Sequence, residues 1–380
     1  MSAETGFVSK IPETQSAITQ DEHGQPRLVN GVAIPALLPG TVLIKTAAVA
    51  LNPSDHKMGA SFPTPGSVIG MDFAGTVVRV ADEGTQTGIA PGSVVCGAVQ
   101  GSNPAAPDNG AFAEYLRAPA DLLMRVPSSP SLQARPDGRD SNAMIQAAAT
   151  MGTALATCIL ALWGSDTLDL LPSTPDTPSQ ATPPTPVLVY GGSTATGSMA
   201  IQLLRLSGFS PIATCSPHNF ELVRARGASA VFDYAAEGVA SAIREHTGCR
   251  LRYALDCIAD AESVACCYTA IQRAGGRYTS LELVGDELLS RRRAVRPSFI
   301  MAPEVFGEEL KLPGGYGKPA SLEKRQLAVR FFAIFQRLLD EGKLKFHPIE
   351  LLEGGFESVV DGLSLLKSGA LSGKKLVAVV

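Results

Sequence analysis

The pattern of apolar and polar residues changes near the middle of the chain. In the first part, the runs at 42–51 and 68–80 are apolar or alternating and lie beside Pro-Gly or Gly turns, which is typical of short β-strands. From residue 187 onward, short apolar runs alternate with helical patterns, which predicts βαβ units and a parallel sheet. We therefore expect an α/β protein with a β-rich part, like a small barrel or sandwich, and a parallel-sheet part.

The parallel-sheet part is predicted to alternate regularly before it ends in a long helix and a helix–strand pair. The strands are 187–190, 211–215, 230–232, 252–256 and 276–280, and the helices between them are 198–207, 219–226, 236–246 and 261–272. The later elements are helices at 321–341 and 356–367 and a strand at 375–380.

Two segments depart from this alternation. No residue between Asp140 and Asp166 is charged, and about 20 apolar residues can span a bilayer. Alanine, threonine and Gln146 interrupt this run, so we interpret 143–163 as a buried core helix, with membrane contact as the alternative. The proline-rich segment 172–186 predicts a solvated, extended surface loop, with a docking segment for a proline-binding module as the alternative.

Composition narrows the class of protein. The chain has 380 residues, of which 45% are hydrophobic, and a formal net charge of −4. Since single cores stop growing near roughly 250–300 residues, two domains are expected. The apolar content argues against disorder, and the mild acidity argues against a nucleic-acid-binding protein.

Cysteine usage indicates a reducing compartment. The chain contains 7 cysteines, which form no C-x-x-C pair and show no zinc-ligand spacing. Most lie among apolar residues, where a free thiol behaves as a small hydrophobic group. The N-terminal sequence lacks the apolar core of a signal peptide, so we expect a cytoplasmic protein with no membrane partner.

A glycine-rich turn at 191–197 (GGSTATG) separates the first strand of the parallel-sheet part from its helix. Glycine lets the backbone approach a ligand, and a helix N-terminus offers free N–H groups to a phosphate. The turn departs from G-x-G-x-x-G, so its βαβ context carries the interpretation as a dinucleotide site. A turn without a ligand is the alternative.

The end of the next predicted strand favours NADP over NAD. An NAD site places Asp or Glu there to bind the ribose 2′-hydroxyl, whereas this chain has neutral Ser216, His218 and Asn219. These residues can donate hydrogen bonds to a 2′-phosphate, and Arg224 follows within two turns. A role for Ser216 and Asn219 as helix caps is compatible with phosphate binding.

A catalytic zinc needs about three protein ligands, and the β-rich part shows no such group. His23, His56 and Cys96 are its His and Cys residues before the core helix, and they form no cluster in the sequence. Hydride addition to an already polarised double bond needs only hydrogen bonds to the carbonyl.

Four motifs resemble the catalytic domain of medium-chain dehydrogenases/reductases. They are Asn52–Asp55, Gly70–Gly75, Pro91–Val95 and Gly110–Tyr115. In that superfamily the quinone and enoyl reductases lack zinc. The zinc-ligating Cys of its alcohol dehydrogenases falls near Asn52, and their Gly-His-Glu falls at Gly70-Met71-Asp72.

A narrower resemblance, over nearly the whole chain, is to the trans-acting enoyl reductases of fungal polyketide synthases or polyketide synthase–peptide synthetase hybrids. It rests on 191–197, 216–219, Asp233-Tyr234, Leu281-Glu282, the stretch after Arg296 and 371–374. It implies that a Rossmann-type parallel-sheet domain is inserted into a β-rich, GroES-like catalytic domain. We expect the catalytic domain at 1–165 and 345–380 and the dinucleotide-binding domain at 166–344.

The resemblance also implies which residues surround NADPH. Those expected at the pyrophosphate are Ser193, Thr194, Ala195 and Thr196, and those at the 2′-phosphate are Ser216, Pro217, His218 and Asn219. Tyr234 is expected near the adenine ribose, Leu281 and Glu282 near the nicotinamide ribose, and Leu371 and Ser372 over the cofactor. The residues expected on the nicotinamide side are Pro53, Ser54, Asp55 and His56.

The implied substrate is an α,β-unsaturated thioester on the acyl carrier domain of an iterative polyketide synthase. The residues expected along the acyl chain are Ile145, Gln146, Ala147, Ala148, Ala149, Thr150, Met151, Gly152, Ala302, Pro303, Glu304, Val305 and Phe306. NADPH would give hydride to Cβ, and Cα would then be protonated.

Candidate donors to the enolate are Lys57, Thr153 and water. Lys57 could instead be a solvated surface residue, Thr153 a helix-packing residue and His56 a backbone-capping residue, while Tyr115 reads as core. Arg291-Arg292-Arg293 and Arg296 could steer a carrier domain or simply form a solvated face.

Two other functions stay open on the sequence alone. One is a free-standing NADPH-dependent quinone or alkenal reductase, and the other is a non-catalytic NADPH-binding protein. Relatives of the implied kind tend to be monomers.

Overall fold

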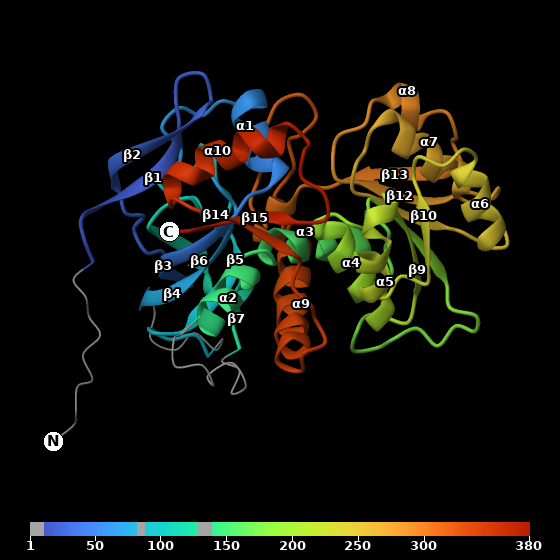
Figure 1. The fold of residues 1–380 in the computed structure, drawn as a ribbon, viewed down its shortest axis with the longest axis horizontal. Helices are drawn as coiled ribbons and strands as arrows, with labels where there is room; N and C mark the ends of the chain where they lie inside the picture. Colours follow the sequence, from blue (N-terminus) through green and yellow to red (C-terminus); the bar gives the residue numbers. More distant parts are fainter. Residues whose placement is uncertain (1–10, 82–87, 128–138) are drawn as a thin grey trace. The chain divides into compact units, whose positions relative to one another are not determined.

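The computed structural model describes residues 11–81, 88–127 and 139–380. The chain divides into two compact units (Figure 1). The first unit contains the chain up to Thr153 together with Pro348–Leu371 and Lys375–Val380. The second contains Ala154–His347 and Ser372–Lys374. The first unit is therefore discontinuous, and the chain returns to it after the second.

The first unit is built on a mostly antiparallel sheet with the order β14-β15-β3-β4-β5-β7, in which β6 also pairs with β3 and only β14 and β15 pair in parallel. A separate hairpin, β1–β2, completes the strands. The strands are β1 Thr14–Gln20, β2 Pro26–Ala33, β3 Thr41–Ala50, β4 Asp72–Val80, β5 Val94–Ala98, β6 Tyr115–Pro119, β7 Met124–Arg125, β14 Ile349–Leu352 and β15 Lys375–Val379. The helices are α1 Pro53–Ser61, the short η1 Ala120–Leu122, α2 Arg139–Ala148 and α10 Phe356–Lys367.

Strand β3 is central, which explains its nearly continuous apolar sequence. It pairs with β4, β6 and the C-terminal strand β15, so both of its edges are hydrogen-bonded. The core beside it contains Phe73 and Phe112 together with Val359 and Leu363 of α10. Burial of these side chains holds the C-terminal segment on the first unit. Each Å² of apolar surface removed from water contributes about 25 cal/mol of stabilising free energy.

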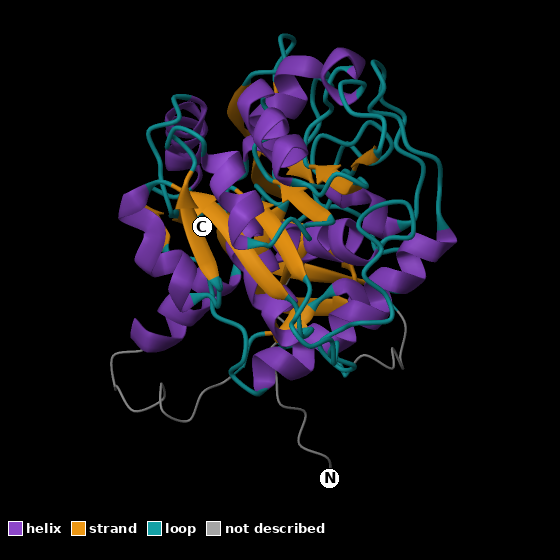
Figure 2. Ribbon diagram, turned by 90° about the vertical axis from the view of Figure 1, so that its right-hand side faces the viewer, coloured by secondary structure: helices purple, strands orange, loops and turns teal. Residues whose placement is uncertain are grey.

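The second unit contains a six-stranded parallel sheet with the order β10-β9-β8-β11-β12-β13. Figure 2 shows the chain from the side of this unit, with strands in orange and helices in purple. Its strands are β8 Pro186–Tyr190, β9 Ser210–Cys215, β10 Ala230–Asp233, β11 Tyr253–Asp256, β12 Gly276–Ser280 and β13 Val295–Phe299. Its helices are α3 Gly152–Trp163 (whose first two residues belong to the first unit), α4 Ala195–Leu206, η2 Pro217–Asn219, α5 Phe220–Ala225, α6 Val239–His246, α7 Ala261–Ala270, α8 Asp286–Leu289, η3 Ala302–Phe306 and α9 Leu322–Asp340.

The order of the six strands is that of a doubly wound dinucleotide-binding fold, with β8 and β11 at the point where the order reverses. Helices α4 and α5 pack against β8, β9 and β10, while α6 and α7 pack against each other and α7 packs against α8. The predicted α/β fold, with a β-rich unit and a parallel-sheet unit, is confirmed.

The prediction of one helix over 143–163 is wrong, because α2 ends at Ala148 and α3 begins at Gly152. At Gly152 a Cβ atom would lie 2.1 Å from the carbonyl oxygen of Gly97, so β5 and the chain meet here at backbone distance. The Asp72 carboxylate accepts from the backbone N–H of Thr153 and satisfies the start of a new helix (2.6 Å). Asn142–Trp163 is long and apolar enough to cross a membrane, but 78% of its window is buried in the protein.

The proline-rich loop is irregular, as predicted, but it is not simply solvated. The Trp163 indole donates to the carbonyl of Ser173 (2.8 Å), and Thr174 is fully buried. The backbone N–H of Ser179 donates to the carbonyl of Ser207 (2.9 Å). The loop is anchored at these points because its carbonyl and amide groups find partners in the second unit.

Candidate active site

The glycine-rich turn of the second unit has the geometry of a phosphate cradle. Gly191 adopts a φ of +83°, which favours glycine, and a Cβ at Gly197 would lie 2.3 Å from the Gly191 carbonyl oxygen. Thr194 caps α4, its hydroxyl accepting from the Gly197 N–H (2.9 Å). The start of α4 therefore presents backbone donors and its positive dipole end beside a turn that only small residues can form.

Neutral donors gather beyond the end of β9. Ser372 belongs to the short C-terminal segment that is part of the second unit. Its hydroxyl lies 2.9 Å from His218 Nε2 and accepts a hydrogen bond from Asn219 Nδ2 at 2.9 Å. The Ser216 and Tyr234 hydroxyls are 3.4 Å apart. Burial raises the pKa of Cys215, at the end of β9, to about 11, so this residue adds no charge. The donor set suits a phosphate rather than a ribose hydroxyl held by a carboxylate.

The segment after β12 holds the two residues expected near the nicotinamide ribose. The backbone N–H of Leu281 donates to the carbonyl of Asp256 (3.2 Å). The Glu282 carboxylate accepts from the Tyr316 hydroxyl at 2.5 Å, and burial together with this contact raises the pKa of Tyr316 to about 12. The residues expected at the pyrophosphate and the 2′-phosphate, together with Tyr234, Leu281, Glu282 and Ser372, all belong to the second unit, whereas Leu371 belongs to the first unit.

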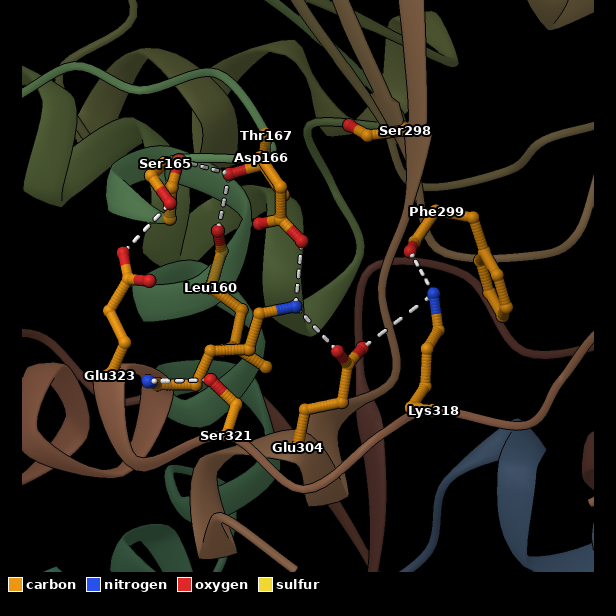
Figure 3. Close-up of polar contacts among 12 residues, drawn as sticks. Leu160, Ser165, Asp166, Thr167, Ser298, Phe299, Glu304, Lys318, Ser321 and Glu323 are labelled. Carbon is orange, nitrogen blue, oxygen red and sulfur yellow. Dashed lines mark hydrogen bonds and ion pairs between the residues drawn. The ribbon is translucent and has the colours of Figure 1, made fainter. Parts of the chain in front are cut away.

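The expected acyl-chain segment 302–306 forms η3, whose Glu304 is buried (Figure 3). One Glu304 oxygen accepts from the Met301 N–H (2.8 Å), and the other accepts from Lys324 Nζ (2.6 Å). Lys324 also binds Asp166 at 2.8 Å. The Glu304 carboxylate is therefore occupied inside the protein and fixes η3 to the start of α9.

Lys318 closes the other side of the same cluster. Its ammonium donates to the carbonyl of Phe299 (2.6 Å), lies 4.6 Å from the centre of the Phe299 ring and is 4.0 Å from Glu304 (Figure 3). Burial lowers the pKa of Lys318, while Glu304 opposes this shift. These contacts tie η3 to the end of β13.

A second polar cluster lies in the first unit, where Asp72 is fully buried at the start of β4. Lys375 is 4% exposed, and its ammonium forms an ion pair with Asp72 and donates to the Asn52 amide oxygen (2.8 Å). The Asn52 amide donates to Asp72 (3.0 Å), and the Thr153 N–H donates to its other oxygen (2.6 Å). The buried carboxylate therefore has a cation and two further donors.

This donor set does not fit a catalytic zinc. Asn52, Met71 and Asp72 stand where the resemblance places zinc-ligating residues, and the ammonium of Lys375 already binds both Asn52 and Asp72. Among the described residues, no group of three His, Cys, Asp or Glu side chains could hold a metal ion. The positive charge at this point of the first unit is supplied by a lysine of the chain itself.

Thr153 is the candidate donor whose surroundings are best defined. Its backbone is fixed by Asp72, its side chain is 8% exposed, and its hydroxyl is buried with no hydrogen-bond partner in the protein. Since buried hydroxyls are normally hydrogen-bonded, an unpartnered one needs an explanation, which a bound ligand would supply. The residues 145–152 precede it, with Ile145, Gln146 and Ala147 half-buried and the others buried.

Helix α1 carries the residues expected on the nicotinamide side. Asp55 accepts from the Asn52 N–H (2.7 Å), its other oxygen has no partner, and burial raises its pKa to about 7. Burial lowers the pKa of His56, with Lys57 and Lys367 acting in the same direction. Lys57 is exposed, and Pro53 and Ser54 begin the helix.

The sequence did not indicate that Asp72 contacts several distant segments of the chain or that Lys375 is its cation. A charged residue directly before an apolar run, Asp72 before Phe73-Ala74 and Lys375 before 376–380, was the available signal. Because the two positions lie 303 residues apart, their pairing was not visible in the sequence.

Comparison with known proteins agrees with this two-unit fold. The alcohol dehydrogenase GroES-like domain matches residues 38–128, and the zinc-binding dehydrogenase family matches 195–312. The chain is 54% identical to the trans-enoyl reductase TwmE of Talaromyces wortmannii, over 97% of this chain and 99% of that protein. It is 44% identical to the trans-enoyl reductase poxP of Penicillium oxalicum, over 97% and 94%.

Solved structures share the fold. A zinc-dependent alcohol dehydrogenase-like protein of Rhizobium etli superposes with a TM-score of 0.74 at 22% identity, over 97% of this chain and 99% of that one. The CurK enoyl reductase superposes with a TM-score of 0.65 at 16% identity, over 96% and 98%. At these identities the likeness concerns the fold alone.

Replacing Lys375 by methionine should lower the free energy of unfolding by about 3–5 kcal/mol, because Asp72 would remain buried without its cation. The double variant D72N/K375M should recover part of this loss, since an uncharged amide is cheaper to bury. Urea unfolding measures both, with K374M as the matched control because Lys374 is exposed. Equal losses for K375M and K374M would contradict the assigned role.

Asp55 should make the protein less stable as the pH rises. Its native pKa of about 7 lies above the unfolded value, so the native state binds this proton more tightly. The stabilisation is complete below about pH 4 and is lost as the pH rises through about 7. Urea unfolding across this pH range should show that the difference in free energy of unfolding between the wild type and D55N falls as the pH rises. A difference that stays constant would contradict the prediction.

Proposed function

The chain belongs to the trans-enoyl reductase family within the medium-chain dehydrogenases/reductases, and from this membership we propose that it is an NADPH-dependent enoyl reductase of polyketide biosynthesis. Its substrate would be an α,β-unsaturated thioester on the acyl carrier domain of a partner synthase. The match to a trans-enoyl reductase over 97% of the chain at 54% identity is the observation that carries this assignment.

The family binds NAD(P), and the second unit supports NADPH as the form used here. Ser193–Thr196 and the start of α4 would hold the pyrophosphate through backbone N–H groups. Ser216, His218, Asn219 and Ser372 would donate to the 2′-phosphate, and no Asp or Glu stands at 214–220 to repel it. When bound, NADPH supplies the hydride that is added to Cβ.

The first unit would manage the negative charge and the proton. Transfer of hydride to Cβ leaves an enolate on the thioester, which hydrogen-bond donors stabilise until Cα accepts a proton. Thr153 is suited to this role because its hydroxyl is buried and has no partner in the protein. Lys57 and water are the other candidate donors, and the acyl chain would contact 145–152 and 302–306.

The partner would be the carrier domain of an iterative polyketide synthase, and the chain itself would be a monomer in the cytoplasm. Support for a monomer comes from β13, the outermost strand of the parallel sheet, which contains Pro297 and the exposed Arg296. Proline and charge on an edge strand oppose pairing with a second sheet. All 7 cysteines are free thiols, which agrees with a reducing compartment.

Introducing a carboxylate at Ser216 should shift cofactor preference. The S216D variant should raise the KM for NADPH by about 100-fold, because like charges placed in contact cost several kcal/mol. The KM for NADH should change little. Steady-state kinetics with both cofactors measure this, and S216A, which adds no charge, should lose only a few-fold in affinity for NADPH. Unchanged NADPH kinetics in S216D would place the 2′-phosphate elsewhere.

The decisive test of the function is turnover of an enoyl thioester. The purified chain with NADPH should reduce an enoyl pantetheine thioester to the saturated product, detected by mass spectrometry. T153V should lower kcat by about 10²–10³-fold, as removal of an oxyanion donor does. T157V, the same change one turn along α3, is the matched control.

Other outcomes would overturn the assignment. Reduction of quinones without reduction of any enoyl thioester would indicate a free-standing quinone reductase. Tight NADPH binding without turnover of any activated alkene would indicate a non-catalytic binding protein.

A further inference from the structure

A cavity of about 630 Å³ lies in the helix layer of the second unit. It is formed by α6, α7, α8 and the turns that follow α7 and α8. Figure 1 labels these three helices near one another, and α7 packs against both α6 and α8. The residues that define its chemistry are Arg244, Tyr268, Arg273, Leu288, Arg291 and Arg292. None of them belongs to the proposed cofactor or substrate residues.

The charges around this cavity have one sign. Four arginines line it, and no Asp or Glu is among the lining residues. Within the described ranges, Arg244, Arg273 and Arg291 take part in no ion pair. Burial lowers the pKa of Arg292, and the charge of Arg244 lowers it further, so the guanidinium groups repel one another. Like charges held together in this way favour an anion between them.

Arg292 has a structural role of its own. It donates to the carbonyls of Tyr268, Ile271 and Gln272, which lie at the end of α7 and just beyond it. These carbonyls carry the partial negative charge of the helix C-terminus, and Arg292 satisfies them. The other three arginines remain to set the potential of the cavity.

Tyr268 lines the cavity with a buried aromatic side chain. It is 5% exposed, and burial raises its pKa to about 12, so it adds no charge. Its ring is held edge to face by Tyr278 at 5.3 Å. The nearby side chains of Val264 and Leu288 give the cavity an apolar wall.

The cavity and the glycine-rich turn lie at opposite edges of the parallel sheet. The turn follows the carboxyl end of β8, whereas Arg273 and Arg292 directly precede the amino ends of β12 and β13. Strands of this length span about 17 Å. An anion in the cavity is therefore separate from the phosphates of NADPH, and a carrier arm that reaches the cofactor would not pass through it.

We propose that this cavity binds a small organic phosphate, a compact anion with a short apolar body. Guanidinium groups pair with phosphate oxygens in bidentate fashion. The apolar wall accepts the remainder of the ligand, and the volume lies in the range of small-molecule sites. The site is independent of the proposed enoyl reductase activity.

Calorimetric titration of phenyl phosphate into the full chain, with NADPH saturating, tests the site. Phenyl phosphate should bind one site per chain and more tightly than inorganic phosphate, whereas benzyl alcohol should not bind. R244Q and R291Q should each weaken binding by at least about tenfold, the loss expected for one charge-assisted contact.

R293Q is the matched control, because Arg293 is exposed and belongs to the same basic run but does not line the cavity. It should change the affinity less than twofold, and all variants should keep the wild-type affinity for NADPH. Absence of phenyl phosphate binding, equal losses in R291Q and R293Q, or binding of an acidic peptide in place of phenyl phosphate would each overturn the proposal. If NADPH itself does not bind, titration without it still compares R291Q with R293Q.

Discussion

The first unit depends on the burial of one carboxylate. Asp72 is fully buried, and a charge without compensation would be very costly there. Its compensation comes from Lys375 at the start of β15, from the Asn52 amide before α1 and from the Thr153 N–H at the start of α3. Because these donors come from three distant segments, the carboxylate can be satisfied only when all of them are in place. The C-terminal strand β15 is thus required to compensate the charge of Asp72 inside the first unit.

The same contacts shape the proposed chemistry. Asp72 accepts a hydrogen bond from the Thr153 N–H at the start of α3, so it fixes the backbone of Thr153, while the Thr153 hydroxyl has no partner in the protein. Lys375 brings a positive charge to Asn52 and Asp72, the positions where the resemblance would place zinc ligands. A reductase that adds hydride to an activated double bond needs donors of this kind and no Lewis acid.

The second unit has two proposed anion sites, which lie at opposite edges of the parallel sheet. At the carboxyl edge, backbone N–H groups and neutral side chains suit the phosphates of a dinucleotide. At the amino edge, four arginines line a cavity with a different character. The η3 segment is held independently of both by the Glu304–Lys324 ion pair (Figure 3).

The sequence by itself determined the fold class, the glycine-rich turn at 191–197 and the neutral strand end at Ser216, because each depends on neighbours within a few residues. Only the tertiary structure decided that the helix is interrupted at 149–151. The composition is apolar throughout this stretch and does not indicate that Gly152 lies close to Gly97. The tertiary structure also decided the pairing of Asp72 with Lys375 and the gathering of arginines from α6 and from the turns that follow α7 and α8. Such contacts join positions far apart in the chain, where no local pattern reports which charged groups will share one buried space.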